Sequence, residues 1–189
     1  MYAVHIPLVK TENGDALLLE VRSRNVTQPG EVCFPGGRME PGETAEETAV
    51  RESCEELGIS PGDIEITSVL VPRVMGDGRK VYPVEARLDA GVTKRLRLFE
   101  DEVSEVFLLP LSWLDENPPL HYCLAETPDE KLPEKLREYL SHYGSYRETG
   151  ETDYIEHDNH GIWGLTARLI LAEYTLKRSY ETGASYCAE

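Results

Sequence analysis

No apolar run in this sequence approaches the roughly 20 residues that a membrane-spanning helix needs. The N-terminus also lacks the basic start, apolar stretch and small-residue cleavage site of a secretory signal. The four cysteines form no C-x-x-C pair and no zinc spacing with histidine. We therefore expect a cytoplasmic protein with no membrane partner, whose cysteines are reduced and structural.

Cations are scarce in this sequence. Lysine and arginine number 19 against 35 aspartates and glutamates, which gives a formal net charge of −16. Such a surface repels nucleic-acid backbones and anionic membranes, so neither is an expected partner. Most of this acidity can be explained by solubility, but some of the carboxylates can also bind metal. An acidic enzyme acting on an anionic substrate would then need local cations.

Repeats, low-complexity segments and linkers are also absent, so we expect one domain over residues 1–189. Strands alternate with helices, which predicts an α/β fold with a mixed sheet flanked by helices. Periodicity and turn signals place the strands at residues 3–9, 16–22, 31–34, 64–74, 80–88, 105–108 and 154–156. Besides a helix at residues 45–57, helices are expected at 113–117, 133–142 and 166–178.

The clearest local signals surround one helix. Residues 40–43, Glu-Pro-Gly-Glu, fit a type II turn. Thr44 then suits a helix N-cap, and Glu47 three residues later completes a capping box. Gly58 is well placed to end the helix. These signals predict a helix over residues 45–57.

Three carboxylates share one face of that helix. At about 100° per residue, Glu52 lies about 40° from Glu56 and about 60° from Glu55, opposite the apolar stripe. Like charges at these spacings destabilise a helix, whereas hard divalent cations prefer such oxygen ligands. Arg51 can pair with Glu43 or Glu52 and hold the face in place. The pattern alone fits either a solvated acidic face or a Mg²⁺ or Mn²⁺ site.

The sequence around this helix resembles a known family signature. Residues 37–59 read GRMEPGETAEETAVRESCEELGI and resemble the Nudix box. The matching positions are Gly37, Glu43, Arg51, Glu52, Glu55, Glu56, Gly58 and Ile59. Ser53 departs from the usual aliphatic residue or alanine at a core-facing position, which we interpret as a packing variation. The resemblance implies a Nudix fold, an α/β/α sandwich, and metal-dependent hydrolysis of a nucleoside diphosphate bond.

The resemblance also implies roles for individual residues. It assigns the metal, Mg²⁺ or Mn²⁺, to Glu52, Glu55, Glu56 and the backbone carbonyl of Gly36. Glu43 would support the site through Arg51. The general base would be either Glu55 or Glu102, although Glu102 also fits a solvated acidic loop.

Other segments resemble the coenzyme A diphosphatase, or pyrophosphatase, branch of that family. Residues 17–37, LLLEVRSRNVTQPGEVCFPGG, carry most of its extra motif, and shorter blocks match at 81–84, 102–111 and 162–167. The implied reaction converts coenzyme A or acyl-coenzyme A to 4′-phosphopantetheine, or its acyl form, and adenosine 3′,5′-bisphosphate. The spacer before Gly30 is one residue short, and Gln28 replaces the branch's usual histidine. Residues 121–155 match nothing in the branch and are a candidate insertion.

Three residues are candidates for binding the substrate. Arg22 suits a phosphate but equally a surface ion pair, and Ser23 follows it in the same motif. Trp163 could line a substrate pocket, although a tryptophan in the core is the commoner case. The resemblance leaves a homodimer open.

Two other functions compete with this one. The chain could be a Nudix enzyme for ADP-ribose, a nucleotide sugar or another nucleoside diphosphate derivative, which the short spacer and Gln28 favour. It could also be a Nudix-fold module that binds a nucleotide without turnover. Such modules generally lose box carboxylates, and this chain keeps them all.

Overall fold

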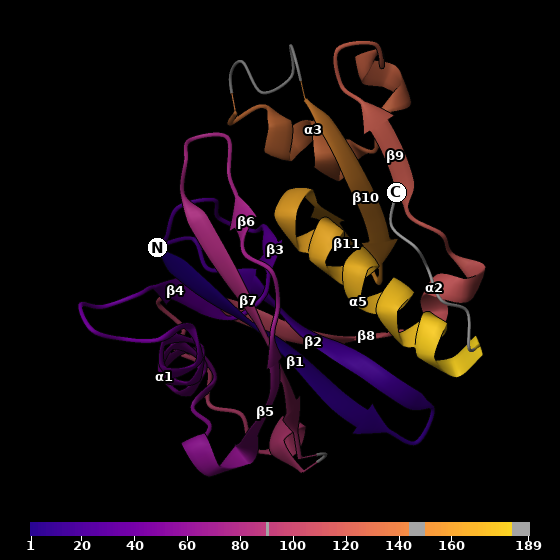
Figure 1. Cartoon of the computed structure of the whole chain (residues 1–189). Helices are drawn as coiled ribbons and strands as arrows, with labels where there is room; N and C mark the ends of the chain where they lie inside the picture. Colours follow the sequence, from indigo (N-terminus) through magenta and orange to yellow (C-terminus); the bar gives the residue numbers. More distant parts are fainter. Residues whose placement is uncertain (90, 144–149, 183–189) are drawn as a thin grey trace. The chain divides into compact units, whose positions relative to one another are not determined.

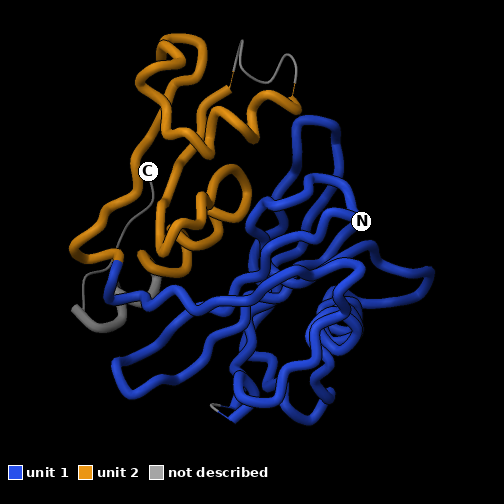
Figure 2. Tube along the Cα trace, turned by 180° about the vertical axis from the view of Figure 1, so that it is seen from behind, with its two compact units in different colours: residues 1–113 blue, residues 114–189 orange. Residues whose placement is uncertain are grey.

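A computed structural model describes residues 1–89, 91–143 and 150–182 of the chain. Contacts divide the chain into two compact units, residues 1–113 and 114–189 (Figure 2). The expected insertion at 121–155 falls in the second unit. The single domain over 1–189 stays a prediction.

The first unit is built on a mixed sheet (Figure 1). Its strands are β1 (Tyr2–Thr11), β2 (Gly14–Arg22), β3 (Val32–Cys33), β4 (Gly36–Arg38), β5 (Ile64–Val69), β6 (Arg73–Val74), β7 (Lys80–Leu88) and β8 (Val103–Pro110). The main path runs β3-β2-β1-β7-β5, with β4 on β1, β6 on β7 and β8 on β2. Since β1 is parallel to β7 and antiparallel to β2, the expected mixed α/β architecture is confirmed.

Most strand predictions agree with the structure. A hairpin joins the expected strands β1 and β2, and the strand expected at 64–74 is divided into β5 and β6. Strand β4 was not predicted, because Pro-Gly-Gly is typical of a break. At Gly36 a Cβ would overlap the carbonyl oxygen of Ala3, so glycine is what allows β4 to approach β1.

Helix α1 (Ala45–Leu57) has the predicted limits and caps. The Thr44 hydroxyl accepts from the Glu47 amide at 3.2 Å, and the Glu47 carboxylate accepts from the Thr44 amide at 2.8 Å. Gly58 ends the helix with φ 64°. The helix packs on β1 and β4 (Figure 1). Its buried residues are Ala45, Thr48, Ala49, Ser53, Glu56 and Leu57.

The second unit contains a three-stranded antiparallel sheet in the order β11-β10-β9. Its elements are β9 (Leu120–Cys123), α3 (Glu134–Leu140), β10 (Glu151–His157), β11 (His160–Trp163) and α5 (Gly164–Thr182), and α2 (Trp113–Glu116) lies at the unit boundary. Strands β9 and β11 were not predicted. The β10–β11 hairpin turns on Asp158 and Asn159, which both have positive φ, a two-residue signal that the sequence carries.

Short 3₁₀ turns lie at Pro61–Asp63, Val92–Lys94 and Asp129–Lys131. Within the described ranges, no helix is long and apolar enough to cross a membrane. Cys33, Cys54 and Cys123 are free and half-buried, whereas Cys187 lies outside the described residues.

The capping box gives a direct test of the α1 N-terminus. Replacing Thr44 by Ala removes the acceptor for the Glu47 amide and should lower the free energy of unfolding by about 1 kcal/mol. Urea denaturation measures this change, and Thr44→Ser should retain most of the stability. Equal destabilisation by Ser and Ala would contradict a role for the hydroxyl.

Candidate functional site

Carboxylates from three elements of the first unit gather between α1 and the sheet. Helix α1 contributes Glu52 and Glu56, strand β2 contributes Glu20, and the loop before β8 contributes Glu102. They lie near enough that the charges of the other three all raise the pKa of Glu56. The site therefore concentrates negative charge at the margin of the core.

Glu56 is the deepest carboxylate that α1 contributes. Its side chain is only 4% exposed, and its Oε2 accepts a hydrogen bond of 2.9 Å from the Gly36 amide. Burial, followed by the Glu20 charge, raises the pKa of Glu56 to about 9. The sequence interpretation that placed Glu56 opposite the apolar stripe is therefore wrong. Glu56 follows Ala49 by seven residues and so points almost the same way, toward the sheet.

Glu52 lies beside the glycine pair that forms β4. A Cβ on Gly37 would overlap the Glu52 carboxylate, so the glycine opens the space that this carboxylate occupies. Burial raises the pKa of Glu52. Gly36 and Gly37 thus serve the site as well as the strand, and the Gly36 backbone lies next to Glu56.

Arg51 connects the acidic residues of the box. Its guanidinium lies 2.8 Å from Glu43, 3.0 Å from Glu52 and 3.2 Å from Glu55, and it also donates to the Arg38 carbonyl oxygen. Hydrogen bonds from Arg51 lower the pKa of Glu43 to about 2. Both pairings expected of Arg51 are thus present together. Glu55, with 59% of its side chain exposed, is on the solvent side of this cluster.

The loop that carries Glu102 is fixed on two sides. The Arg97 and Phe99 amides donate to the carbonyl oxygens of Leu57 and Glu56, each at 2.9 Å, at the end of α1. On the other side, the Ser23 amide donates to the Glu102 carbonyl oxygen at 2.8 Å.

Ser23 has a second bond to the same loop. Its hydroxyl donates to the Asp101 carbonyl oxygen, and its side chain is buried. The structure therefore uses Ser23 to position the loop, and its expected contact with substrate stays a prediction.

The other two candidate substrate residues lie in different units. Arg22 donates to the Thr27 carbonyl oxygen at 2.7 Å and, more weakly, to the Cys33 sulfur at 3.8 Å. Trp163 is buried in the core of the second unit, where it stacks on Tyr139 with ring centroids 6.3 Å apart. This core position accounts for Trp163, and its role in binding stays a prediction.

The departure at Ser53 has a polar partner. Ser53 donates to the Ala49 carbonyl oxygen at 2.8 Å, so its oxygen is free to accept from Nδ1 of the buried His5 at 2.7 Å. This assigns the Nδ1–H tautomer to His5 and keeps the imidazole neutral, since burial lowers its pKa to about 3. Ser53 therefore serves hydrogen bonding in the core as well as packing.

The donor set fits a hard divalent cation. Among the described residues, no three His, Cys, Asp or Glu side chains already surround a common point as ligands. However, buried carboxylates that repel one another need either protons or a cation. Oxygen donors are those that Mg²⁺ and Mn²⁺ prefer. Glu52 and Glu56 could hold such an ion, and the Gly36 backbone lies next to Glu56.

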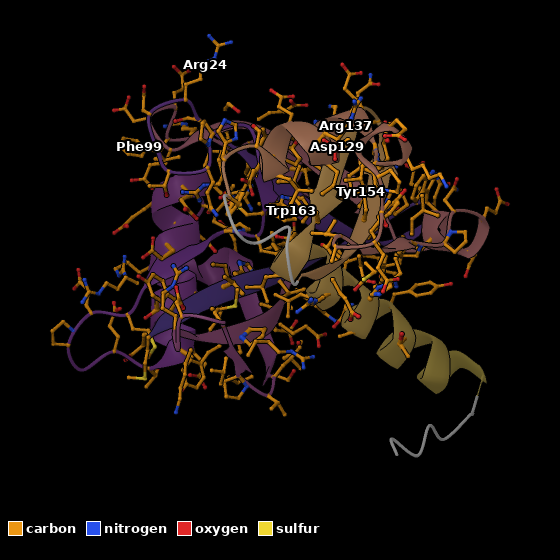
Figure 3. The ribbon with its side chains drawn as sticks, turned by 90° about the horizontal axis from the view of Figure 1, so that it is seen from above. Arg24, Phe99, Asp129, Arg137, Tyr154 and Trp163 are labelled. Carbon is orange, nitrogen blue, oxygen red and sulfur yellow. The ribbon has the colours of Figure 1, made fainter. Side chains whose placement is uncertain are left out.

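Sequence reasoning missed several residues near this site. Glu20 and His5 carried a signal, because each is a polar residue within a strand that is otherwise apolar and buried. Arg24 and Phe99 are exposed on the loops that Ser23 ties together, and Figure 3 labels both side chains on the first unit.

Comparisons with known proteins match this picture. The model of the NUDIX domain matches residues 1–129. Nudix hydrolase 3 of Caenorhabditis elegans is 35% identical over 92% of this chain and 72% of its own length. The peroxisomal coenzyme A diphosphatase NUDT7 of Mus musculus is 34% identical over 90% of this chain and 67% of its own. A crystal structure of a C. elegans Ap4A hydrolase shares the fold, with a TM-score of 0.52 and 17% identity over 77% of this chain and 97% of its own.

The raised pKa of Glu56 predicts how stability depends on pH. Its ordinary pKa is 4.5, and in the fold it is about 9, so the folded protein holds a proton that the unfolded chain releases between these values. With a chelator present to remove metal, the free energy of unfolding should therefore fall as pH rises from about 5 to about 9. For one proton the decrease is at most about 1.4 kcal/mol per pH unit. Urea denaturation across this range measures the slope. Glu56→Gln should flatten it, and an unchanged slope would contradict the burial of this carboxylate.

Proposed function

This chain belongs to the Nudix hydrolase family, and we propose that it hydrolyses the diphosphate bond of coenzyme A or an acyl-coenzyme A with Mg²⁺ or Mn²⁺. The products would be 4′-phosphopantetheine, or its acyl form, and adenosine 3′,5′-bisphosphate. One observation carries the proposal: the segment 17–37, with its resemblance to the coenzyme A branch, lies directly against the complete carboxylate site of α1. The relative named as a coenzyme A diphosphatase supports it.

The residues around the diphosphate bond have different proposed roles. Glu52, Glu56 and the Gly36 carbonyl would hold the divalent ion. When bound, that ion neutralises diphosphate charge and lowers the pKa of a water. Arg51 fixes the orientation of Glu52 and is itself held by Glu43.

We favour Glu102 over Glu55 as the general base. The Glu55 carboxylate accepts a hydrogen bond from Arg51, so one of its oxygens is already occupied. The Glu102 backbone is fixed by Ser23 and Phe99, while its carboxylate makes no hydrogen bond within the described residues. A free carboxylate on a fixed backbone is better suited to accept a proton from water.

The substrate's own charge must be met by local cations, because the chain as a whole is acidic. Burial lowers the pKa of Arg22, but its neighbours Cys33, Glu20 and Glu56 together raise that pKa above its ordinary value, so Arg22 lies near the carboxylates of the site. Only part of its five-donor guanidinium is used. Arg24 adds an exposed cation, and Phe99, 47% exposed, adds an aromatic face suited to a base. A phosphorylated adenine nucleotide fits this combination.

A cytoplasmic location belongs to the same proposal. The mouse relative is named peroxisomal, so the compartment is a separate question from the reaction. Imaging of the tagged chain in its own cells would decide it.

The second candidate is hydrolysis of ADP-ribose or a nucleotide sugar, favoured by the short loop at Gln28. In the structure this loop is a tight turn: Gln28 has φ 61°, and the Gly30 amide donates to the Arg22 carbonyl oxygen at 3.0 Å. This loop is one residue shorter than in the coenzyme A branch. If the shorter loop places the Arg22 guanidinium differently, Arg22 would bind a different phosphate of the substrate.

A substrate panel read by mass spectrometry tests the proposal. With Mg²⁺ or Mn²⁺, the protein should release adenosine 3′,5′-bisphosphate from coenzyme A. Glu56→Gln should lower kcat/KM roughly 100-fold or more, because it removes a metal-site carboxylate. Glu65→Gln, an exposed residue of β5, should leave the rate unchanged and serves as the matched control.

The panel also separates the alternatives. Cleavage of ADP-ribose with coenzyme A left intact would overturn the substrate and leave the diphosphatase reaction standing. Failure to cleave any diphosphate with either metal would favour the binding module.

A further inference from the structure

We propose that Glu20 is a further carboxylate ligand of the metal site, entering it from the sheet while Glu52 and Glu56 enter from α1. The inference rests on the metal site of the proposed function, but neither the Nudix box nor the segment matches assign this residue any role.

Glu20 is a carboxylate in an unusual place. It follows three buried leucines in the middle of β2, and it is 1% exposed. Glutamate is almost never fully buried unless it is paired, because removing the charge from water is costly. A buried glutamate in a strand of leucines therefore requires a specific partner.

The Glu20 carboxylate does not find enough hydrogen-bond donors among the described residues. The Cys33 thiol donates to Oε1 at 3.2 Å, and a thiol is a weak donor. Oε2 is buried and has no hydrogen-bond partner in the described part of the chain. Over the same residues, no salt bridge joins Glu20 to a cation, since the Arg22 guanidinium is directed at Thr27 and Cys33.

The surroundings of Glu20 are the other carboxylates of the site. The charges of Glu102 and Glu52 act on Glu20, and Glu20 acts more strongly than either of them on Glu56. Glu56 is in turn tied to β4 through the Gly36 amide. Carboxylates from a helix, a strand and a loop thus lie near enough for their charges to interact, and the unpartnered Oε2 of Glu20 belongs to this group.

A divalent cation resolves this arrangement. Mg²⁺ and Mn²⁺ bind several oxygen ligands, and a carboxylate from the sheet completes a ligand set that α1 supplies only from one side. The competing explanation is structural, in which Glu20 only accepts from Cys33 and balances Arg22. The two explanations differ in what the loss of the charge does to metal affinity.

Metal affinity and stability together test the proposal. Mn²⁺ binding is measured by electron paramagnetic resonance of the free ion for wild type, Glu20→Gln, Glu56→Gln and Glu65→Gln, and urea unfolding is measured in a chelator. Glu20→Gln should weaken Mn²⁺ binding roughly tenfold or more. Without metal it should be at least as stable as wild type, because it removes a buried charge beside other carboxylates. Glu65→Gln should match wild type in both measurements.

The outcomes separate this inference from the proposed function. Wild-type Mn²⁺ affinity in Glu20→Gln, with weakened affinity in Glu56→Gln, would overturn the role of Glu20 alone. Wild-type affinity in both variants would overturn the metal site itself. If Glu20→Gln does not fold, Glu20→Asp is tested in its place. Aspartate keeps the charge but has one methylene fewer, so the carboxylate lies farther from the ion. Unchanged Mn²⁺ affinity in Glu20→Asp would again overturn the proposal.

Discussion

The burial of the Glu56 carboxylate between α1 and the sheet is the constraint on which the site depends. Its contact with the Gly36 amide ties the helix to β4, and β4 can lie against β1 only because Gly36 has no side chain, while Gly37 leaves room for the Glu52 carboxylate. The charge of Glu20 on β2 also acts on Glu56. Charge repulsion at this point opposes folding, and a bound cation would offset it.

Arg51 and the loop of residues 97–102 complete this arrangement from the outside. Arg51 neutralises the solvent side of the cluster through Glu43, Glu52 and Glu55, but the structure gives it no bond to Glu56. The loop is bonded to the last turn of α1 and to Ser23, so Glu102 is held near the site by backbone contacts. Glu43, Glu52 and Glu55 are therefore paired with Arg51, whereas the buried Glu20 and Glu56 have no cation bonded to them among the described residues.

The parts of the fold and the site that could be predicted from the sequence are those set by residues close together in the chain. The limits of α1 follow from Thr44, Glu47 and Gly58, which act within a few residues, and they were predicted correctly. The burial of Glu56 was not predicted, because the carboxylates were assigned to the face opposite the apolar stripe. Glu56 lies seven residues after Ala49 and therefore on the same buried side of α1. Glu20 and the His5–Ser53 pair depend on contacts between distant segments, which one sequence shows only as polar residues in apolar strands. Strand β4 was missed because its glycines are typical of a break and are needed here for close approach.

Proton release on metal binding is the most direct test of whether the buried Glu56 is a metal ligand. At pH 7 the raised pKa of Glu56 means that its carboxylate is protonated without metal, and a ligand must give up that proton. Calorimetric titration with Mn²⁺ in buffers of different ionisation enthalpy counts the protons. We expect at least about one proton released per bound ion at pH 7, because burial also raises the pKa of Glu20 to about 7, and markedly fewer in Glu56→Gln. Binding without proton release in the wild type would contradict the account.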